Sequence, residues 1–385
     1  MPLFLNNNDQ EKCITPKEAM EALAHGIRQF AQGEAIRRPR IDNLLPTENP
    51  DEYFCFSSME GGIRDPGYYA LRIKPDIYGW QNVGGKVRET TYSYRPGLYG
   101  GLVFLYSTKN AEFLAIMNDG YVQHLRVAAT AGLGIQYLSR RDSRVMGVYG
   151  TGGMASFFPL TAKAARPIER LQVYSTNSAR REKYCNDMAS KIGCEIVSVD
   201  RPELVCQGAD IVVACTNSIE PVMHADWVRP GMHLSNVTHW ELSPETCTKI
   251  DAAGIFVRRS PLSVAGYVDD DFGIRLNVMA YIAGRPEERA KVPVGRMSKN
   301  RYPNARIVEC CDWQNDTEYS EGRGNDEITI LANCSYGTLE GDVGNSAGIQ
   351  GIQFSSIAGK IYEKARQLGL GMELPRDMFL QDLPT

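Results

Sequence analysis

The chain has 385 residues, which is long enough for two domains of ordinary size, each with its own hydrophobic core. Apolar residues make up 43% and charged residues 23% of the sequence, as is typical of soluble globular proteins. The net charge of −4 and the lack of a basic run give no electrostatic reason to expect nucleic acid or an anionic membrane as a partner. No apolar run approaches the ~18 residues that a membrane span requires.

The N-terminus and the cysteines predict a cytoplasmic protein. The first residues lack the basic and long apolar segments of a signal peptide. The ten cysteines are scattered without C-x-x-C spacing, so we expect reduced thiols. The five histidines show no spacing typical of metal ligands, and we expect no metal site.

The first predicted element is an amphipathic helix over residues 16–33, with a typical N-terminal cap at Thr15 and Pro16. Short apolar and aromatic runs then alternate with turn signals, which predicts an antiparallel sheet with one covered face. These runs are Tyr53–Phe56, Tyr68–Ile73, Leu102–Tyr106 and Phe113–Met117. A long helix is predicted over about 121–139.

A glycine-rich turn follows that helix. The apolar run Val145–Tyr149 leads directly into a G-x-G-x-x-A pattern and then into a helix-compatible segment, the order of a dinucleotide-binding βαβ unit. Gly150 permits the tight turn, Gly152 lets the backbone approach a pyrophosphate, and Ala155 lets the helix pack close to its strand. The predicted cofactor residues of this turn are Gly150, Thr151, Gly152, Gly153, Met154 and Ala155.

After the turn, strand and helix patterns alternate, which predicts a parallel sheet with helices on both faces. The predicted strands are 171–175, 195–199, 211–215, 232–237, 255–258 and 328–332, and the predicted helices are 153–165 and 178–192. Pro159 is expected to kink or shorten the first of these helices.

Two later segments complete the expected architecture. Residues 285–326 are polar and contain three prolines, which indicates an insertion or lid. The helix predicted over 350–368 is expected to pack back against the N-terminal sheet. The fold class is therefore α/β, with a doubly wound Rossmann-type domain (about 121–335) inserted in a second, α+β domain (1–120 plus 336–385).

The end of the predicted strand 171–175, the second strand of the Rossmann-type sheet, indicates which cofactor is preferred. NAD-preferring sites usually place an acidic residue there to bind the ribose 2′-hydroxyl. This chain has Ser175, Thr176 and Asn177 instead, followed by Arg180 and Arg181, and these donors suit a 2′-phosphate. The pattern favours NADP over NAD. The alternative is that both arginines are the solvated first turn of a helix.

Polar residues at the next strand ends are expected to line the same crevice. Thr216 and Asn217 follow the strand 211–215, and Val237 ends the strand 232–237. An ordinary turn is the alternative interpretation of Thr216 and Asn217. His239 comes directly after the second of these strands, at the edge of the crevice.

Three cations are candidates for binding a substrate carboxylate. Arg72 and Lys74 occupy positions i and i+2, so they share one face of a strand that reads as buried, where a charge requires a partner. That partner is either a substrate carboxylate or a set of internal salt bridges. Arg126, early in the helix 121–139, either reaches the cleft between the domains or is solvated.

Three segments, 119–155, 208–237 and 348–371, resemble the ornithine cyclodeaminase/mu-crystallin family. The resemblance implies a cytoplasmic NAD(P)-dependent enzyme for small amino, imino or keto acids, dimeric through the domain outside the Rossmann fold. The Leu-Arg-Thr motif of the family falls on Leu125-Arg126-Val127, so the resemblance makes Arg126 the carboxylate-binding arginine. The substrate lysine of the family aligns nearest Arg72, with Lys74 one pleat further on, and either of the two could inherit the role.

The segment after the predicted strand 232–237 departs from the family pattern. Members that cyclodeaminate usually carry an acid/base aspartate there, whereas this chain reads Asn236-Val-Thr-His-Trp-Glu-Leu242. The nearest titratable groups are His239 and Glu241, and a histidine suffices for a single proton transfer. We therefore expect an NAD(P)H-dependent imine reductase or amino-acid dehydrogenase that transfers hydride to the α-carbon, with His239 as a catalytic or hydrogen-bonded structural residue. The alternatives are an ornithine cyclodeaminase-type lyase using catalytic NAD, or a non-catalytic NADPH- or ligand-binding protein like the crystallin.

Overall fold

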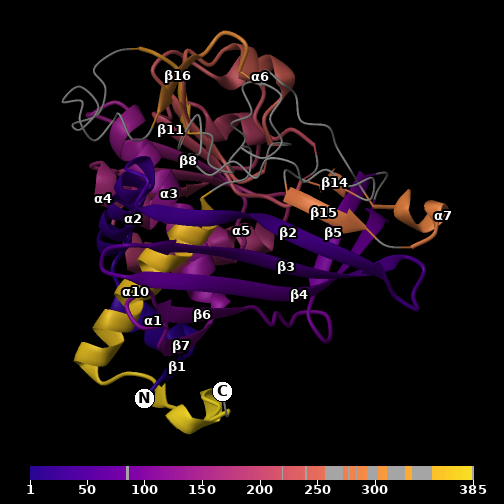
Figure 1. The fold of residues 1–385 in the computed structure, drawn as a ribbon. Coiled ribbons are helices and arrows are strands. Elements are labelled where there is room, and N and C mark those ends of the chain that lie inside the picture. Colours follow the sequence, from indigo (N-terminus) through magenta and orange to yellow (C-terminus); the bar gives the residue numbers. More distant parts are fainter. Residues whose placement is uncertain are drawn as a thin grey trace.

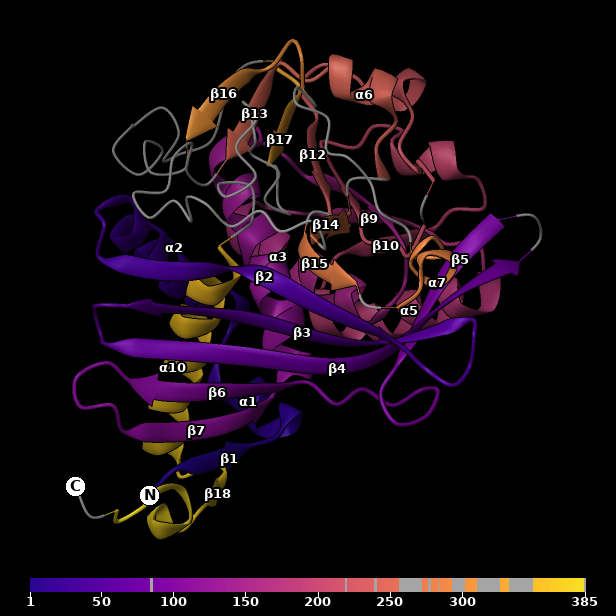
Figure 2. The same ribbon diagram turned by 45° about the vertical axis from the view of Figure 1, so that its right-hand side comes forward.

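The computed structural model of the chain contains two β-sheets linked by the helix α3 (Asp119–Leu138), as Figures 1 and 2 show. The residues that it describes are 1–83, 86–218, 220–238, 241–255, 272–275, 278–282, 284–292, 302–309, 326–331 and 349–383.

The first sheet has ten strands in the order β14-β15-β2-β3-β4-β6-β7-β1-β18, with β5 paired to β4. Its strands are β1 (Leu3–Leu5), β2 (Ala35–Pro46), β3 (Glu52–Ile63), β4 (Tyr68–Val83), β5 (Lys86–Tyr92), β6 (Leu102–Ser107), β7 (Phe113–Asn118), β14 (Phe272–Arg275), β15 (Val278–Ile282) and β18 (Met372–Glu373). The four runs predicted from the sequence are β3, β4, β6 and β7, and they pair antiparallel as expected. The sheet as a whole is mixed, because β1 lies parallel to β7 and β15 lies parallel to β2.

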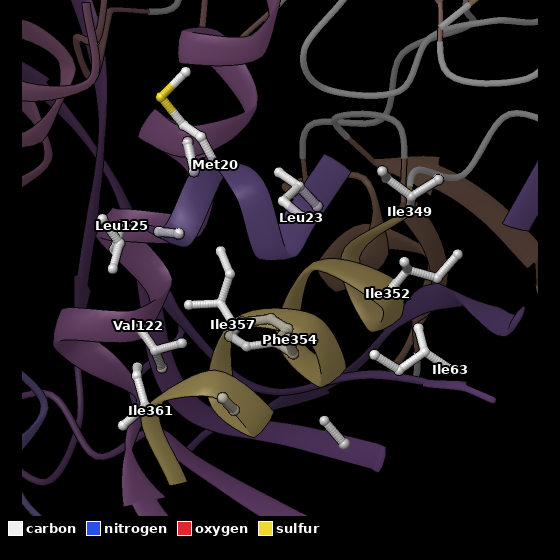
Figure 3. Packing of buried hydrophobic residues seen from close by; sticks show 14 of the residues in the cluster. Met20, Leu23, Ile63, Val122, Leu125, Ile349, Ile352, Phe354, Ile357 and Ile361 are labelled. Carbon is white, nitrogen blue, oxygen red and sulfur yellow. The ribbon is translucent and has the colours of Figure 1, made fainter. Parts of the chain in front are cut away.

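Three helices cover one face of this sheet: α2 (Pro16–Ala31), α3 and α10 (Gln350–Leu368). Figure 3 shows their apolar side chains meeting: Met20, Leu23, Val122, Leu125, Ile352, Phe354, Ile357 and Ile361. α10 begins in backbone contact with β3, because a Cβ on Gly351 would lie only 1.9 Å from the Glu60 carbonyl oxygen. The C-terminal helix thus packs against the N-terminal sheet, as predicted.

The second sheet has eight parallel strands in the order β10-β9-β8-β11-β12-β17-β13-β16. Its strands are β8 (Val145–Tyr149), β9 (Arg170–Tyr174), β10 (Glu195–Ser198), β11 (Ile211–Ala214), β12 (His233–Asn236), β13 (Ala252–Ile255), β16 (Arg306–Glu309) and β17 (Thr329–Leu331). α3, α4 (Phe157–Ala165) and α5 (Ser178–Ile192) bury apolar side chains on one face, and α6 (Pro244–Thr248) covers the other. This is the predicted doubly wound, Rossmann-type sheet.

The first helix after the glycine-rich turn is shortened, as expected from Pro159. Residues Gly153–Ser156 form a 3₁₀ turn, and the regular helix α4 begins only at Phe157. Pro159 lies in the first turn of α4, where a missing N–H leaves no hydrogen bond unmade.

The predictions from the sequence need correction at four strands. β13 ends at Ile255, where the predicted strand 255–258 begins, and residues 256–258 lie outside the described part. β16 lies inside the segment 285–326 that was interpreted as an insertion or lid, yet it is the edge strand beside β13. β14 and β15 fall inside the predicted Rossmann range, yet they extend the first sheet beside β2.

The predicted domain boundaries near 121 and 335 stay a prediction, because α3 belongs to both cores. Its apolar residues pack on α2 and α10 on one side and on α4 on the other. The C-terminal end of α3 is closed by Arg166, whose guanidinium donates to the carbonyls of Gln136, Ser139 and Arg140. Burial lowers the pKa of Arg166 to about 10, so the arginine stays charged at neutral pH.

Candidate functional site

A cavity of about 1060 Å³ opens at the carboxyl edge of the parallel sheet, where β8, β9, β11 and β12 end. Its volume lies at the upper end of the ~300–1,000 Å³ common for small-molecule sites, which suits an extended ligand. Twelve of the fourteen cofactor residues predicted from the sequence line it: Gly150, Thr151, Gly152, Gly153, Met154, Ser175, Thr176, Asn177, Arg180, Thr216, Asn217 and Val237.

The glycine-rich turn forms one wall of this cavity. Gly150 has a φ of +104°, and a Cβ there would lie 2.6 Å from the Cys215 carbonyl oxygen, so only glycine fits. Gly152 has no other atom within 4 Å of the position of a Cβ, which leaves its open side to a ligand. Ala155 is fully buried beneath the turn and packs in the core instead of lining the cavity.

The two arginines that were predicted to bind a 2′-phosphate follow β9, and only one of them lines the cavity. Arg180 lines the cavity, and its backbone N–H donates to the Asn177 side chain, which caps α5. Arg181 does not line the cavity. Its guanidinium donates to the Ser198 hydroxyl at 2.7 Å and to the Ser175 carbonyl at 2.8 Å, so Arg181 fixes the loop that carries the other donors.

A buried carboxylate that the sequence left without a clear role joins two walls of the cavity. Glu241 is fully buried and accepts hydrogen bonds from the Thr216 N–H and hydroxyl, at 2.6 and 2.8 Å. It also accepts from the backbone N–H groups of Val237 and Thr238, at 2.8 and 2.9 Å. Burial raises the pKa of Glu241, and these donors oppose the rise. The carboxylate ties the loop after β11 to the loop after β12. The neighbouring candidate His239 lies outside the described residues.

The predicted cations lie beside the cavity and do not line it. Arg72 and Lys74 share one face of β4, opposite Met59 and Ser57 of β3, as their spacing predicted. Each already has an acidic partner. Arg72 donates twice to Asp119, at 2.6 and 2.9 Å, and the Lys74 Nζ lies 2.7 Å from an oxygen of Asp76. The alternative interpretation, internal salt bridges, is thus what the structure contains.

Arg126 is 8% exposed and is not a solvated helix residue. Its guanidinium donates to the side-chain oxygens of Gln353 at 2.7 Å and Gln123 at 3.0 Å. The guanidinium carbon also lies 5.3 Å from the centre of the Phe354 ring. These contacts hold Arg126 between α3 and α10.

A third buried pair on the same sheet face was missed from the sequence. Arg40 of β2 donates to both carboxylate oxygens of Asp42, at 2.8 and 3.1 Å, and to the Ser57 hydroxyl at 3.2 Å. Pairing with Asp42, whose side chain is fully buried, holds the pKa of Arg40 above its usual value although burial acts in the opposite direction. The spacing Arg-x-Asp on a strand was the only available signal.

Two side chains connect the cluster of ion pairs with the cavity, and both were missed from the sequence. Tyr99 and His124 line the cavity although neither belongs to the parallel sheet. The Lys74 Nζ stands 5.6 Å from the centre of the Tyr99 ring. Burial lowers the pKa of His124, Asp119 opposes this, and the charges of Arg126 and Lys74 add to it. The His124 imidazole is therefore neutral at neutral pH.

Within the described residues no group of three or more His, Cys, Asp or Glu side chains is arranged to hold a metal ion. The helices in that part of the chain are each too short or too polar to cross a membrane.

A doubly wound parallel sheet whose glycine-rich turn opens into a cavity at its carboxyl edge defines a dinucleotide-binding protein of the Rossmann type. The chain belongs to the ornithine cyclodeaminase/mu-crystallin family, whose model matches residues 2–240.

Relatives of this chain include NAD(P)-dependent oxidoreductases. The alanine dehydrogenase of Archaeoglobus fulgidus is 27% identical over 61% of this chain and 66% of its own length. Sequence matches to the first curated relatives span 62 to 68% of their lengths. Two solved structures share the fold with a TM-score of 0.66. Pyrroline-2-carboxylate reductase of Thermococcus litoralis, in complex with NADH and L-proline, is 21% identical and covers 97% of this chain and 100% of its own. An archaeal alanine dehydrogenase dimer with bound NAD is 23% identical and covers 97% and 99%.

Replacing Glu241 tests whether its carboxylate holds the two loops together. In Glu241→Gln the amide nitrogen cannot accept a hydrogen bond, so at least one buried N–H loses its partner. We expect the free energy of unfolding to fall by about 2–4 kcal/mol, measured by chemical denaturation. The control Glu245→Gln, on the exposed start of α6, should change it by less than ~1 kcal/mol. Equal stability of Glu241→Gln and the unchanged protein would contradict this role.

Proposed function

We propose that the protein is an NAD(P)H-dependent oxidoreductase of the imine reductase or amino-acid dehydrogenase type, acting on a small amino or imino acid. The observation that carries this proposal is the position of the buried ion pairs of Arg72 and Lys74 directly beside the dinucleotide cavity, with Tyr99 and His124 between them. Relatives named as alanine dehydrogenase and pyrroline-2-carboxylate reductase support the substrate class.

The residues that line the cavity fit a dinucleotide. The N–H groups of the turn from Thr151 to Met154 would bind its diphosphate, since the Gly150 N–H already donates to the Tyr174 carbonyl, and the open side of Gly152 gives the close approach that this needs. When bound, the nicotinamide would supply or accept the hydride. Thr216, Asn217 and Val237 lie at the ends of β11 and β12, where Glu241 fixes the backbone against which the nicotinamide would rest.

NADP(H) is the cofactor that the end of β9 favours. Ser175, Thr176 and Asn177 provide hydroxyl and amide groups, and Arg180 adds a charged donor at the cavity. No acidic residue occupies the position that usually binds the ribose 2′-hydroxyl of NAD. The solved relatives that carry NADH or NAD make NAD(H) the alternative.

Arg126, Lys74 and Arg72 would orient the α-carboxylate of the substrate. Arg126 is held by amide oxygens on two sides, which fixes the direction of its guanidinium. Lys74 is held between Asp76 and the Tyr99 ring, at the border of the cavity. A carboxylate fixed by these groups would place the α-carbon against the cavity, and orientation of this kind lowers reaction barriers substantially.

Net reduction fits the residues better than deaminating cyclisation, because the segment after β12 lacks the family aspartate. A cyclodeaminase needs repeated proton transfers, whereas imine reduction needs one proton at nitrogen. A non-catalytic, crystallin-like role is the other alternative, since the salt bridges of Arg72 and Lys74 would serve a binding protein as well. We also propose a homodimer, as in the archaeal relative.

Arg180→Ala tests the cofactor assignment. Loss of a charged hydrogen bond to the 2′-phosphate should weaken NADPH binding about tenfold, with little change for NADH. Nucleotide fluorescence measures both dissociation constants. Lys183→Ala, on the exposed surface of the same helix, is the matched control and should leave both unchanged. Tighter binding of NADH than of NADPH by the unchanged protein, or equal loss of both in Arg180→Ala, would contradict the assignment.

A substrate panel tests the reaction class. Small keto acids with ammonia or methylamine, together with cyclic imino acids, should oxidise NAD(P)H. Arg126→Gln should lower kcat/KM on the order of 100-fold, because the α-carboxylate loses its oriented partner. If Arg126→Gln left kcat/KM unchanged for every accepted substrate, the proposed role of Arg126 in orienting the α-carboxylate would be wrong.

Ornithine with catalytic NAD(P)⁺ separates the alternatives. Proline and ammonia formed without net consumption of nucleotide would show a cyclodeaminase. Tight nucleotide binding without turnover of any substrate would instead favour the crystallin-like role.

A further inference from the structure

His124 reaches the glycine-rich turn from outside the parallel sheet. The side chain comes from α3 and lines the cavity, and its ring packs beside Phe157 with 5.6 Å between the ring centres. A Cβ on Gly153 would lie 3.1 Å from the His124 Cε1, so the imidazole occupies the space beside this glycine.

The contact with His124 explains why residue 153 is a glycine, which the G-x-G-x-x-A pattern does not explain. The pattern needs small residues only at Gly150, Gly152 and Ala155. Gly153 is outside the positive-φ glycines of the chain, so its backbone conformation does not require glycine either. Because Gly153 has no side chain, the imidazole of His124 can lie against the turn.

Both ring nitrogens of His124 are available at the cavity. Within the described part of the chain neither nitrogen has a hydrogen-bond partner. Neither nitrogen is among the fully buried polar atoms that lack a partner, so both can still be reached by a ligand. An imidazole at the edge of a turn that binds an anion can donate to that anion.

We propose that His124 donates a hydrogen bond to the diphosphate of the bound dinucleotide, and that nucleotide binding is thereby coupled to protonation of this imidazole. The inference rests on the proposed dinucleotide site and adds a residue from α3 to it. The diphosphate would then be held by backbone N–H groups on one side and by the imidazole on the other.

The charges around His124 give the direction of the coupling. Asp119 and Arg126 face it from α3 and Lys74 from β4, whereas Phe157 of α4 presents an apolar ring. Burial holds the pKa of His124 below its usual value. A bound diphosphate brings negative charge and raises this pKa. Binding therefore takes up a proton, and affinity increases as the pH falls through the pKa of the loaded protein.

The experiment measures the dissociation constant of NADH by fluorescence between pH 5.5 and 8.5, with calorimetry in two buffers to count the protons taken up. NADH has no 2′-phosphate, so the ligand adds no ionisation of its own near neutral pH. A shift of one pKa unit corresponds to about a tenfold change in affinity across this range. We expect about this tightening toward low pH, with proton uptake on binding.

Variants assign the response to His124. His124→Gln keeps an N–H donor but cannot titrate, so its NADH affinity should be independent of pH and within about threefold of the unchanged protein at pH 8. Gly153→Ala should displace the imidazole and weaken binding, and this loss should shrink in the background of His124→Ala. His224→Gln removes another imidazole of the cavity, one that packs edge-on against Trp227, and should keep the pH response.

The outcomes separate this inference from the proposed function. NADH binding that is independent of pH in the unchanged protein, or a pH response that survives in His124→Gln, overturns the inference alone. Failure of the unchanged protein to bind either NADH or NADPH contradicts both.

Discussion

The helix α3 is the constraint on which the site depends, because its side chains belong to the cores of both sheets. Asp119 at its start pairs with Arg72 of the first sheet, and His124, just over one turn later, reaches the glycine-rich turn of the second. Arg166 satisfies the carbonyls at its far end. Because one continuous helix carries both contacts, the ion pairs of the first sheet and the cavity of the second are connected without a loop between them.

Buried charge is distributed differently on the two sides of this helix. Each buried cation of β4 in the first sheet has an acidic partner, in the pairs Arg72–Asp119 and Lys74–Asp76, which offsets the cost of burying each charge. Beside the second sheet, the buried carboxylate of Glu241 is stabilised by four donors from two loops. The first arrangement neutralises the cations that lie beside the cavity, and the second joins the loops after β11 and β12 that form its wall.

The sequence predicted correctly those features that depend on neighbouring residues in the chain, such as turns, strand ends and helix bounds. The glycine-rich turn and the strand ends beside it lie within a few residues of their motifs, and α5 and α10 have the predicted bounds. β13 was misplaced because Ala252–Gly254 offers little apolar bulk, although it is fully buried. Arg72 meets Asp119 across 47 residues of chain, and His124 meets Gly153 from another helix, so no spacing in the sequence announces either contact.

We propose that hydride passes between the nicotinamide and the α-carbon of a small amino or imino acid at this cavity. The most direct measurement uses NADPH deuterated at C4 on the transferring face, with an accepted imino acid, and locates the label in the product by mass spectrometry and NMR. We expect one deuterium at the α-carbon for each NADPH oxidised. Oxidation of NADPH with no deuterium at that carbon would contradict this proposed hydride transfer.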